Sequence, residues 1–308
     1  MKRRMAIFAS LVLAGWMAAP RLVAQPAAAA PAAPAKKALF WKVSSATNTT
    51  YLLGSIHLGS KEMYPLPMEI EEAFERSAAL LVEIDINHVD TQKMQGLVLQ
   101  TGMYAGDDTL WDHIGKEARQ RLEEFCEKYG VPAMAMAKMK PWVVATMMAT
   151  LPLMKNGMEM GLGIDKYFLD KADKARKRVV EIESAEAQMK LIAGITGEML
   201  EKSLAASANR DPQEFAKRIE EAWISGDAGQ MEKIVREQTS SDPVEFDKAM
   251  LQDRSLHMAD VAEQFLKGKE PAFVVVGAGH MVGPDGVVKL LEKRGYKVEQ
   301  VAIGPLPH

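Results

Sequence analysis

Two stretches with the same pattern, far apart in the chain, most strongly constrain its fold. Each is a short apolar run of β-forming residues followed by Gly-x-x-His: residues 51–57 end in His57, and residues 273–280 end in His280. Such runs predict buried strands, and a glycine near the end of a strand allows the backbone to turn sharply. Because open sheets bind ligands at the ends of their strands, we expect both histidines in one cleft.

The first 24 residues have the pattern of a secretory leader. A basic start is followed by an uncharged apolar run over residues 5–19, which Pro20 ends. This run is shorter than the roughly 20 apolar residues that a membrane-spanning helix needs, and the sequence predicts no stable span in the mature protein. Residues 25–37, rich in Ala and Pro, are expected to be a flexible linker. We therefore expect cleavage near residue 24 and export to a periplasm or to the exterior.

The charge balance argues against nucleic acid as a partner. The chain has 38 basic and 41 acidic residues, and removal of a leader with four basic residues leaves 34 against 41, a net charge of −7. An acidic exported protein is poorly suited to nonspecific nucleic-acid binding. Cys126 is the only cysteine, so no internal disulfide can form, and its helical spacing predicts a buried thiol.

Strand-like runs occur at both ends of the chain, with a long helical stretch between them. The predicted strands cover residues 38–43, 50–56, 79–85, 178–183, 273–276 and 296–303. This pattern indicates an α/β fold, in which a mixed β-sheet core has flanking helices and a large helical middle insertion, about residues 91–267. We expect one domain over residues 38–303, with a helical subdomain as the alternative, and the helical middle as the roof of the cleft.

The order and spacing of these motifs resemble those of the TraB/PrgY/GumN family. The resemblance rests on residues 40–43, 54–59, 81–85 and 277–280, and it extends over roughly residues 38–303. This family is similar to the Tiki metalloproteases and, more distantly, to erythromycin esterase and ChaN-like proteins. The resemblance implies the α/β fold of these relatives, and its Tiki branch implies peptide hydrolysis.

His57, His280 and Glu83 are the predicted metal ligands. Two imidazoles and a carboxylate suit Zn²⁺, Mn²⁺ or Co²⁺ and leave a position for water, whose pKa the metal would lower. The resemblance aligns Glu83 with an acidic position of the family, which makes it a candidate catalytic base as well. The remaining histidines have no such motif and are interpreted as surface or structural residues: His88, His113, His257 and His308.

Glu183 and Arg254 are the other predicted catalytic residues, in a supporting role beside Glu83. Glu183 ends a predicted strand, in a segment that resembles an acidic segment of the family. Arg254 matches an arginine of the family, although this chain has Ser255 where the family commonly has asparagine. An arginine that faces a cleft can bind a carboxylate or stabilise an oxyanion, whereas one on a solvated face does neither.

Other functions would use the same features. A metal- or haem-binding protein without catalysis would need the same histidines, as the ChaN resemblance permits. A peptide-sequestering protein, which the pheromone-shutdown relatives imply, would hold a peptide or small molecule in the cleft without turnover. A dinucleotide enzyme is disfavoured because the third glycine after Gly277 and Gly279 comes one position late, and no Gly-x-Ser-x-Gly motif indicates a serine hydrolase. The methionines of residues 134–160 are interpreted as core or groove packing, with copper binding as the alternative.

Overall fold

The structure, a computed structural model, describes residues 36–207, 211–239 and 243–304. The predicted leader, the predicted linker up to residue 35, and His308 lie outside the described residues. In the described part of the chain, no helix is both long enough and apolar enough to cross a membrane.

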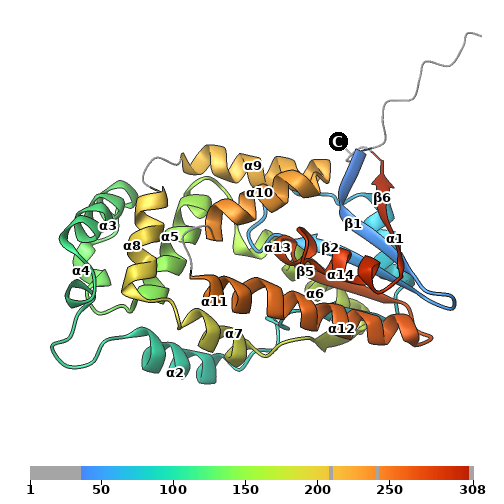
Figure 1. Cartoon of the computed structure of the whole chain (residues 1–308), viewed down its shortest axis with the longest axis horizontal. Coiled ribbons are helices and arrows are strands. Elements are labelled where there is room, and N and C mark those ends of the chain that lie inside the picture. The colour runs from blue at the N-terminus through green and yellow to red at the C-terminus, as the bar shows by residue number, and fades with distance from the viewer. Residues whose placement is uncertain (1–35, 208–210, 240–242, 305–308) are drawn as a thin grey trace, which may run out of the picture. The chain divides into compact units, whose positions relative to one another are not determined.

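Within these residues the strands form one six-stranded sheet, on the right in Figure 1. Its strands are β1 (Lys36–Ser44), β2 (Thr49–Ser55), β3 (Ala79–Val82), β4 (Arg178–Glu181), β5 (Ala272–Gly277) and β6 (Lys297–Ile303). The strands are ordered β4-β3-β5-β2-β1-β6, and only β1 runs antiparallel to its neighbours. The sheet is therefore mixed, as predicted, and β1 begins two residues before the expected start of the fold.

The position of each strand in the sheet follows its apolar content. β5 is buried from Ala272 to Val276 and lies between two parallel neighbours, as a continuous apolar run requires. β4 lies at the edge and is partly exposed along its length. The predicted hairpin of β1 and β2 is confirmed, and Ser45 Oγ accepts a hydrogen bond from the Asn48 N–H in its turn.

Helices cover both faces of the sheet (Figure 1). On one face lie α1 (Met68–Arg76) and α6 (Ile164–Ala175), and on the other α12 (Asp253–Lys267), α13 (Ala278–Met281) and α14 (Val287–Lys293). Phe74 of α1 and Phe168 of α6 pack on Phe273 of β5, with ring centroids 5.7 Å and 4.8 Å from its ring. This aromatic cluster joins three separate parts of the chain and anchors the sheet.

The helical middle contains a second hydrophobic core, in which Leu122, Met136 and Leu200 are fully buried. Apart from α6, the helices between β3 and α12 are α2 (Thr91–Gly102), α3 (Lys116–Tyr129), α4 (Ala133–Met136), α5 (Pro141–Lys155), α7 (Ala185–Ile192), α8 (Gly197–Ser207), α9 (Pro212–Ser225), α10 (Ala228–Thr239) and α11 (Val244–Asp247). Short helical turns accompany them: η1 (Lys61–Met63), η2 (Leu110–Asp112), η3 (Met160–Leu162) and the π-helical η4 (Lys248–Gln252). Cys126 is buried here, as predicted, and its thiol contacts the Met136 sulfur at 3.5 Å. Met134, by contrast, is exposed, so only part of the methionine-rich segment is core.

Replacement of the central aromatic ring tests the importance of this packing. We expect Phe273→Ala to lower the free energy of unfolding by about 3–5 kcal/mol, because a large cavity forms between the sheet and two helices. Leu99→Ala is the control, since Leu99 is 67% exposed, and its effect should stay within about 0.5 kcal/mol. Urea unfolding followed by circular dichroism measures both. Equal losses in the two variants would contradict the packing described here.

Candidate functional site

Four parallel strands end at the same edge of the sheet, and each leads into a candidate site residue. In the sheet register, Ser55 at the end of β2 lies opposite Gly277 at the end of β5, and β3 and β4 end beside them. The residues that follow these ends are His57, Glu83, Glu183 and His280. Ligands of open sheets bind at this edge, so the fold itself brings the four side chains together.

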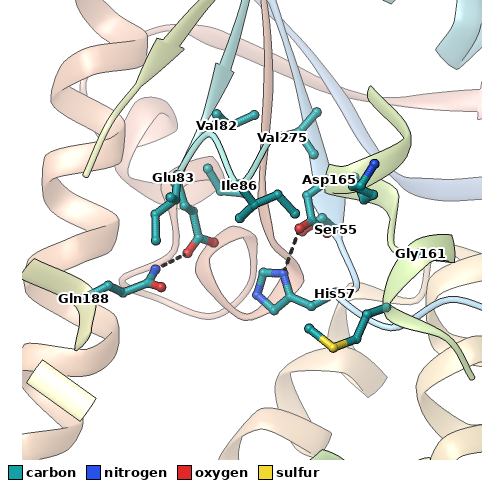
Figure 2. A pocket seen from close by; sticks show the side chains of 13 residues that line it. Ser55, His57, Val82, Glu83, Ile86, Gly161, Asp165, Gln188 and Val275 are labelled. Carbon is teal, nitrogen blue, oxygen red and sulfur yellow. Dashed lines mark hydrogen bonds and ion pairs between the residues drawn. The ribbon is translucent and has the colours of Figure 1, made fainter. Parts of the chain in front are cut away.

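Glu83 is the buried centre of this group, with 8% of its surface exposed. Its Oε1 accepts a hydrogen bond from the Gly277 N–H at 2.6 Å. Its Oε2 accepts from Arg254 Nη2 at 2.7 Å and from Gln188 Nε2 at 2.9 Å (Figure 2). A buried carboxylate is very costly unless donors surround it, and these three donors meet that requirement.

The charge of Glu83 is maintained by its surroundings. Burial by itself would raise the pKa of Glu83, but positive charge at His280, His57 and Arg254, with the hydrogen bond from Gly277, lowers it to about 2. Burial also lowers the pKa of His280, so this ring is neutral at pH 7. At that pH, therefore, His57, Arg254 and the Gly277 N–H stabilise the ionised Glu83.

Arg254 joins the two glutamates rather than facing the cleft with free donors. Its Nε donates to both carboxylate oxygens of Glu183, at 2.8 Å and 3.0 Å. Its Nη2 donates to Glu183 at 2.8 Å as well as to Glu83, and its Nη1 donates to the Met250 carbonyl at 3.1 Å. Because every guanidinium nitrogen already has a protein acceptor, the arrangement supports a positioning role. Binding of a substrate carboxylate or oxyanion by Arg254, which has a second N–H on Nη1, stays a prediction.

His280 lies in the short helix α13, directly after β5, and is 5% exposed. Its Nδ1 lies 2.9 Å from Ser255 Oγ, and its Nε2 has no hydrogen bond to any described residue. The hydroxyl fixes the orientation of the ring and leaves Nε2 as the nitrogen for a ligand. Ser255, which stands at the position of the family's asparagine, thus contacts the second histidine directly.

His57 follows β2 in a loop and differs from His280 in exposure, with 61% of its side chain accessible. Its Nδ1 lies 3.3 Å from Asp165 Oδ2, as Figure 2 shows. Desolvation opposes protonation of His57, but the carboxylates of Asp165 and Glu83 outweigh it and raise the pKa of the ring. Solvent around so exposed a ring screens these charges and limits the rise.

The glycines of the two motifs are needed for close approach, which corrects the expectation that they form turns. A Cβ on Gly277 would lie 3.1 Å from Glu83 Oε1, 3.7 Å from His57 Nε2 and 3.8 Å from His280 Cδ2. The missing side chain therefore leaves a space that all three predicted metal ligands border. Gly54 lies inside β2, where a Cβ would approach the Cα of Ala278 to 3.1 Å.

A cavity of about 380 Å³ opens beside His57 and Glu83 (Figure 2). Its wall is mainly apolar and includes Val82, Ile84, Ile86, Met160, Val275 and Val276. Polar and charged side chains also line it: Ser55, Asp165, Lys166 and Gln188. His280 does not line this cavity and lies behind Gly277.

The five side chains singled out from sequence are therefore near one another, and other residues join them. Asp85, the last residue of the predicted strand over residues 79–85, lies beyond the end of β3 and contacts His88. Sequence reasoning did not single out four polar residues of the site: Ser55, Asp165, Gln188 and Ser255. Ser55 lies inside the first motif and Ser255 beside Arg254, so position was a usable signal for these two.

The predicted metal can be tested against this geometry. The donor set fits Zn²⁺, Mn²⁺ or Co²⁺ in chemistry, because two imidazoles and a carboxylate are ligands that these ions accept. His57 Nε2, Glu83 Oε1 and Cδ2 of the His280 ring border the space at Gly277. Among the described residues, however, no group of three His, Cys, Asp or Glu side chains is already arranged to hold a metal ion. Metal binding therefore requires side-chain movement, for which the exposed His57 is the freest of the three.

Comparison with known proteins identifies the family. A model of the TraB/PrgY/gumN family matches residues 39–300, and the chain belongs to this family, as its motifs predicted. The chain is 28% identical over 142 residues to a protein of Escherichia coli (strain K12) named "Uncharacterized protein YbaP", a match that covers 46% of this chain and 51% of the relative. The Shigella flexneri protein of that name is also 28% identical, over 143 residues.

A longer match is with an uncharacterized protein of Treponema pallidum (strain Nichols). It is 20% identical over 283 residues and covers 84% of this chain and 81% of the relative. The matches to the two YbaP proteins span about half the length of those relatives. No solved structure matches the chain. The match to the family model thus establishes the family, and the activity is inferred from the site.

The lowered pKa of Glu83 predicts how stability depends on pH. Its native pKa of about 2 lies below the ordinary 4.5, so ionised Glu83 stabilises the fold above pH 4.5, and this contribution is lost as the pH falls toward 2. We expect Glu83→Gln to reduce the free energy of unfolding at pH 7 by up to about 3 kcal/mol, and by much less at pH 3.

Urea unfolding at both pH values measures this difference. Glu117→Gln is the matched control, because the Glu117 side chain is 82% exposed and should change stability little at either pH. A loss for Glu83→Gln that is the same at pH 7 and pH 3 would show that Glu83 is not held ionised by its surroundings.

Proposed function

We propose that this member of the TraB/PrgY/gumN family is an exported, metal-dependent hydrolase of peptide bonds. Its site would be formed by the two Gly-x-x-His motifs, with His57, His280 and Glu83 as ligands of Zn²⁺, Mn²⁺ or Co²⁺. The partner would be a peptide or small molecule bound in the cavity beside β2 and β3. Export would depend on the leader over residues 1–24.

One observation carries the proposal. His57 Nε2, which has no hydrogen bond, the His280 ring and one buried, ionised carboxylate border a single space, which exists because residue 277 has no side chain. This space lies next to a cavity with mainly apolar walls. Convergent polar groups beside an apolar cavity are the usual form of a binding or catalytic site.

Each residue of the site would have its own role in binding the metal or positioning its ligands. A bound metal ion would lower the pKa of a water molecule and polarise the scissile carbonyl. Ser255 holds the His280 ring so that Nε2 is available, and Asp165 contacts Nδ1 of His57 and leaves its Nε2 available. Such contacts to the second ring nitrogen orient histidine ligands and strengthen them.

Arg254 and Gln188 orient Glu83 and keep it charged. Arg254 also compensates the charge of Glu183, which would otherwise repel Glu83 at the end of the neighbouring strand. The apolar walls of the cavity exclude water from the substrate and strengthen the electrostatic interactions near it. Glu83, Glu183 and Arg254 thus act as one charge-balanced unit behind the two histidines.

Metal content tests the proposal before any substrate is known. We expect purified residues 25–308 to contain close to one metal ion per chain by elemental mass spectrometry. His57→Ala and His280→Ala should each lower metal affinity at least tenfold, because each removes one of three ligands. His88→Ala is the control, since this exposed histidine contacts Asp85 outside the site and should leave metal content unchanged.

Folding of each variant is checked by circular dichroism, and hydrolysis is then measured on a library of acetylated hexapeptide amides by mass spectrometry. A folded chain that binds no Zn²⁺, Mn²⁺ or Co²⁺ on reloading would contradict the proposal of a metal-dependent hydrolase. Peptide binding without cleavage would then favour a peptide-sequestering protein. Metal or haem binding without cleavage would favour a metal- or haem-binding protein without catalysis.

A further inference from the structure

Two polar atoms in the wall of the cavity have no hydrogen-bond partner among the described residues. They are Ser55 Oγ and Asp165 Oδ1, and both are buried. Ser55 is 3% exposed, at the end of β2 and two residues before His57. A buried polar atom without a partner costs about 1–3 kcal/mol, so two of them in one cavity wall need an explanation.

The position of Asp165 is fixed by the backbone around it. The Ile164 N–H donates to the Ile56 carbonyl at 3.1 Å, which joins the start of α6 to the loop of His57. A Cβ on Gly163 would lie 2.4 Å from the His57 carbonyl oxygen, so only glycine permits this approach. Asp165 Oδ2 contacts His57, and Oδ1 is the second, buried oxygen of the same carboxylate, in a residue that lines the cavity.

A simpler reason for an aspartate here is the dipole of α6, whose first turn contains Asp165. That reason explains the negative charge but gives no cause for burying Oδ1 without a donor. Nor does it explain Ser55, which belongs to a strand. The two atoms share only the cavity.

From this we infer that Ser55 and Asp165 form a subsite for one residue of an extended peptide, next to the bond that is hydrolysed. Asp165 Oδ1 can only accept a hydrogen bond, so it would take the backbone N–H of that residue. The Ser55 hydroxyl would donate to the carbonyl oxygen of the same residue. In an extended chain these two groups point to the same side, as they do in a hydrogen-bonded pair of a β-ladder.

This inference rests on the proposed function and gives Asp165 two roles, one for each carboxylate oxygen. Oδ2 orients His57, and Oδ1 binds substrate. Ser55 has only the binding role, because it makes no hydrogen bond to His57 or to any other described residue. The two residues should therefore differ in the kinetic parameters that they control.

The hexapeptide cleaved most rapidly in the library is the probe. We expect Ser55→Ala to raise KM about five- to tenfold with kcat nearly unchanged, and Asp165→Ala to change both. N-methylation of one backbone nitrogen beside the cleaved bond should lower kcat/KM of the wild type about tenfold but leave that of Asp165→Ala unchanged. Thr50→Val is the matched control: Thr50 Oγ1, in the same strand, is also buried without a partner but does not line the cavity, so KM should stay unchanged.

A second measurement needs no substrate. If the two hydroxyls have no partner, Ser55→Ala and Thr50→Val should both leave Tm unchanged or raise it, by about 2–4 °C at most. A clear fall in Tm for Ser55→Ala would mean that the hydroxyl is already held by ordered water, and it would overturn the subsite.

The outcomes separate the two proposals. Cleavage of peptides with KM unchanged in Ser55→Ala, or with no N-methyl position coupled to Asp165, overturns the subsite and leaves the proposed hydrolase standing. Failure of the wild type, loaded with metal, to cleave any peptide overturns both.

Discussion

The buried negative charge of Glu83 is the constraint around which the site is built. A carboxylate this deep needs donors on both oxygens, and they come from β5, α7 and α12, which are distant in sequence. Each of these elements must therefore be in place before the charge is tolerated. Glu183 shares Arg254 with Glu83, so the ends of two neighbouring strands are fixed relative to α12 as well as to each other. The site therefore forms only when these elements have packed together.

Much of this arrangement could be predicted from local sequence. Apolar runs identify the strands, and strands that run parallel in one sheet end at one edge, so His57 and His280 were expected to lie near each other. Glu83, Glu183 and Arg254 came from the resemblance to the family, and the comparison confirmed that the chain belongs to this family. Local pattern does not give the order of the strands, and so it could not tell that β5 separates β2 from β3.

The partners of the histidines could not be predicted in the same way. Asp165 contacts His57 across more than a hundred residues of sequence, through the pairing of two loops that no strand periodicity indicates. Ser255 contacts His280 because α12 crosses the sheet at a particular angle, which is decided by side-chain packing. Arg254 looked available for substrate from its position alone, and only the placement of both glutamates shows that its Nε and Nη2 donors are occupied. Pairwise contacts between distant segments are what a single sequence does not contain.

The π-helical segment η4 is a place where the length of the chain can change between relatives while the site residues after it keep their positions. A π-turn accommodates one residue more than an α-turn does, and each residue rotates an α-helix by about 100°. The segment ends directly before α12, so gain or loss of one residue within it re-aims α11 about the helix axis and leaves Arg254 and Ser255 seated on the sheet. Relatives that gain or lose one residue here would thus orient α11 differently while Arg254 and Ser255 keep their places at the edge of the sheet, so insertion and deletion would change the surroundings of these residues and leave their own contacts in place.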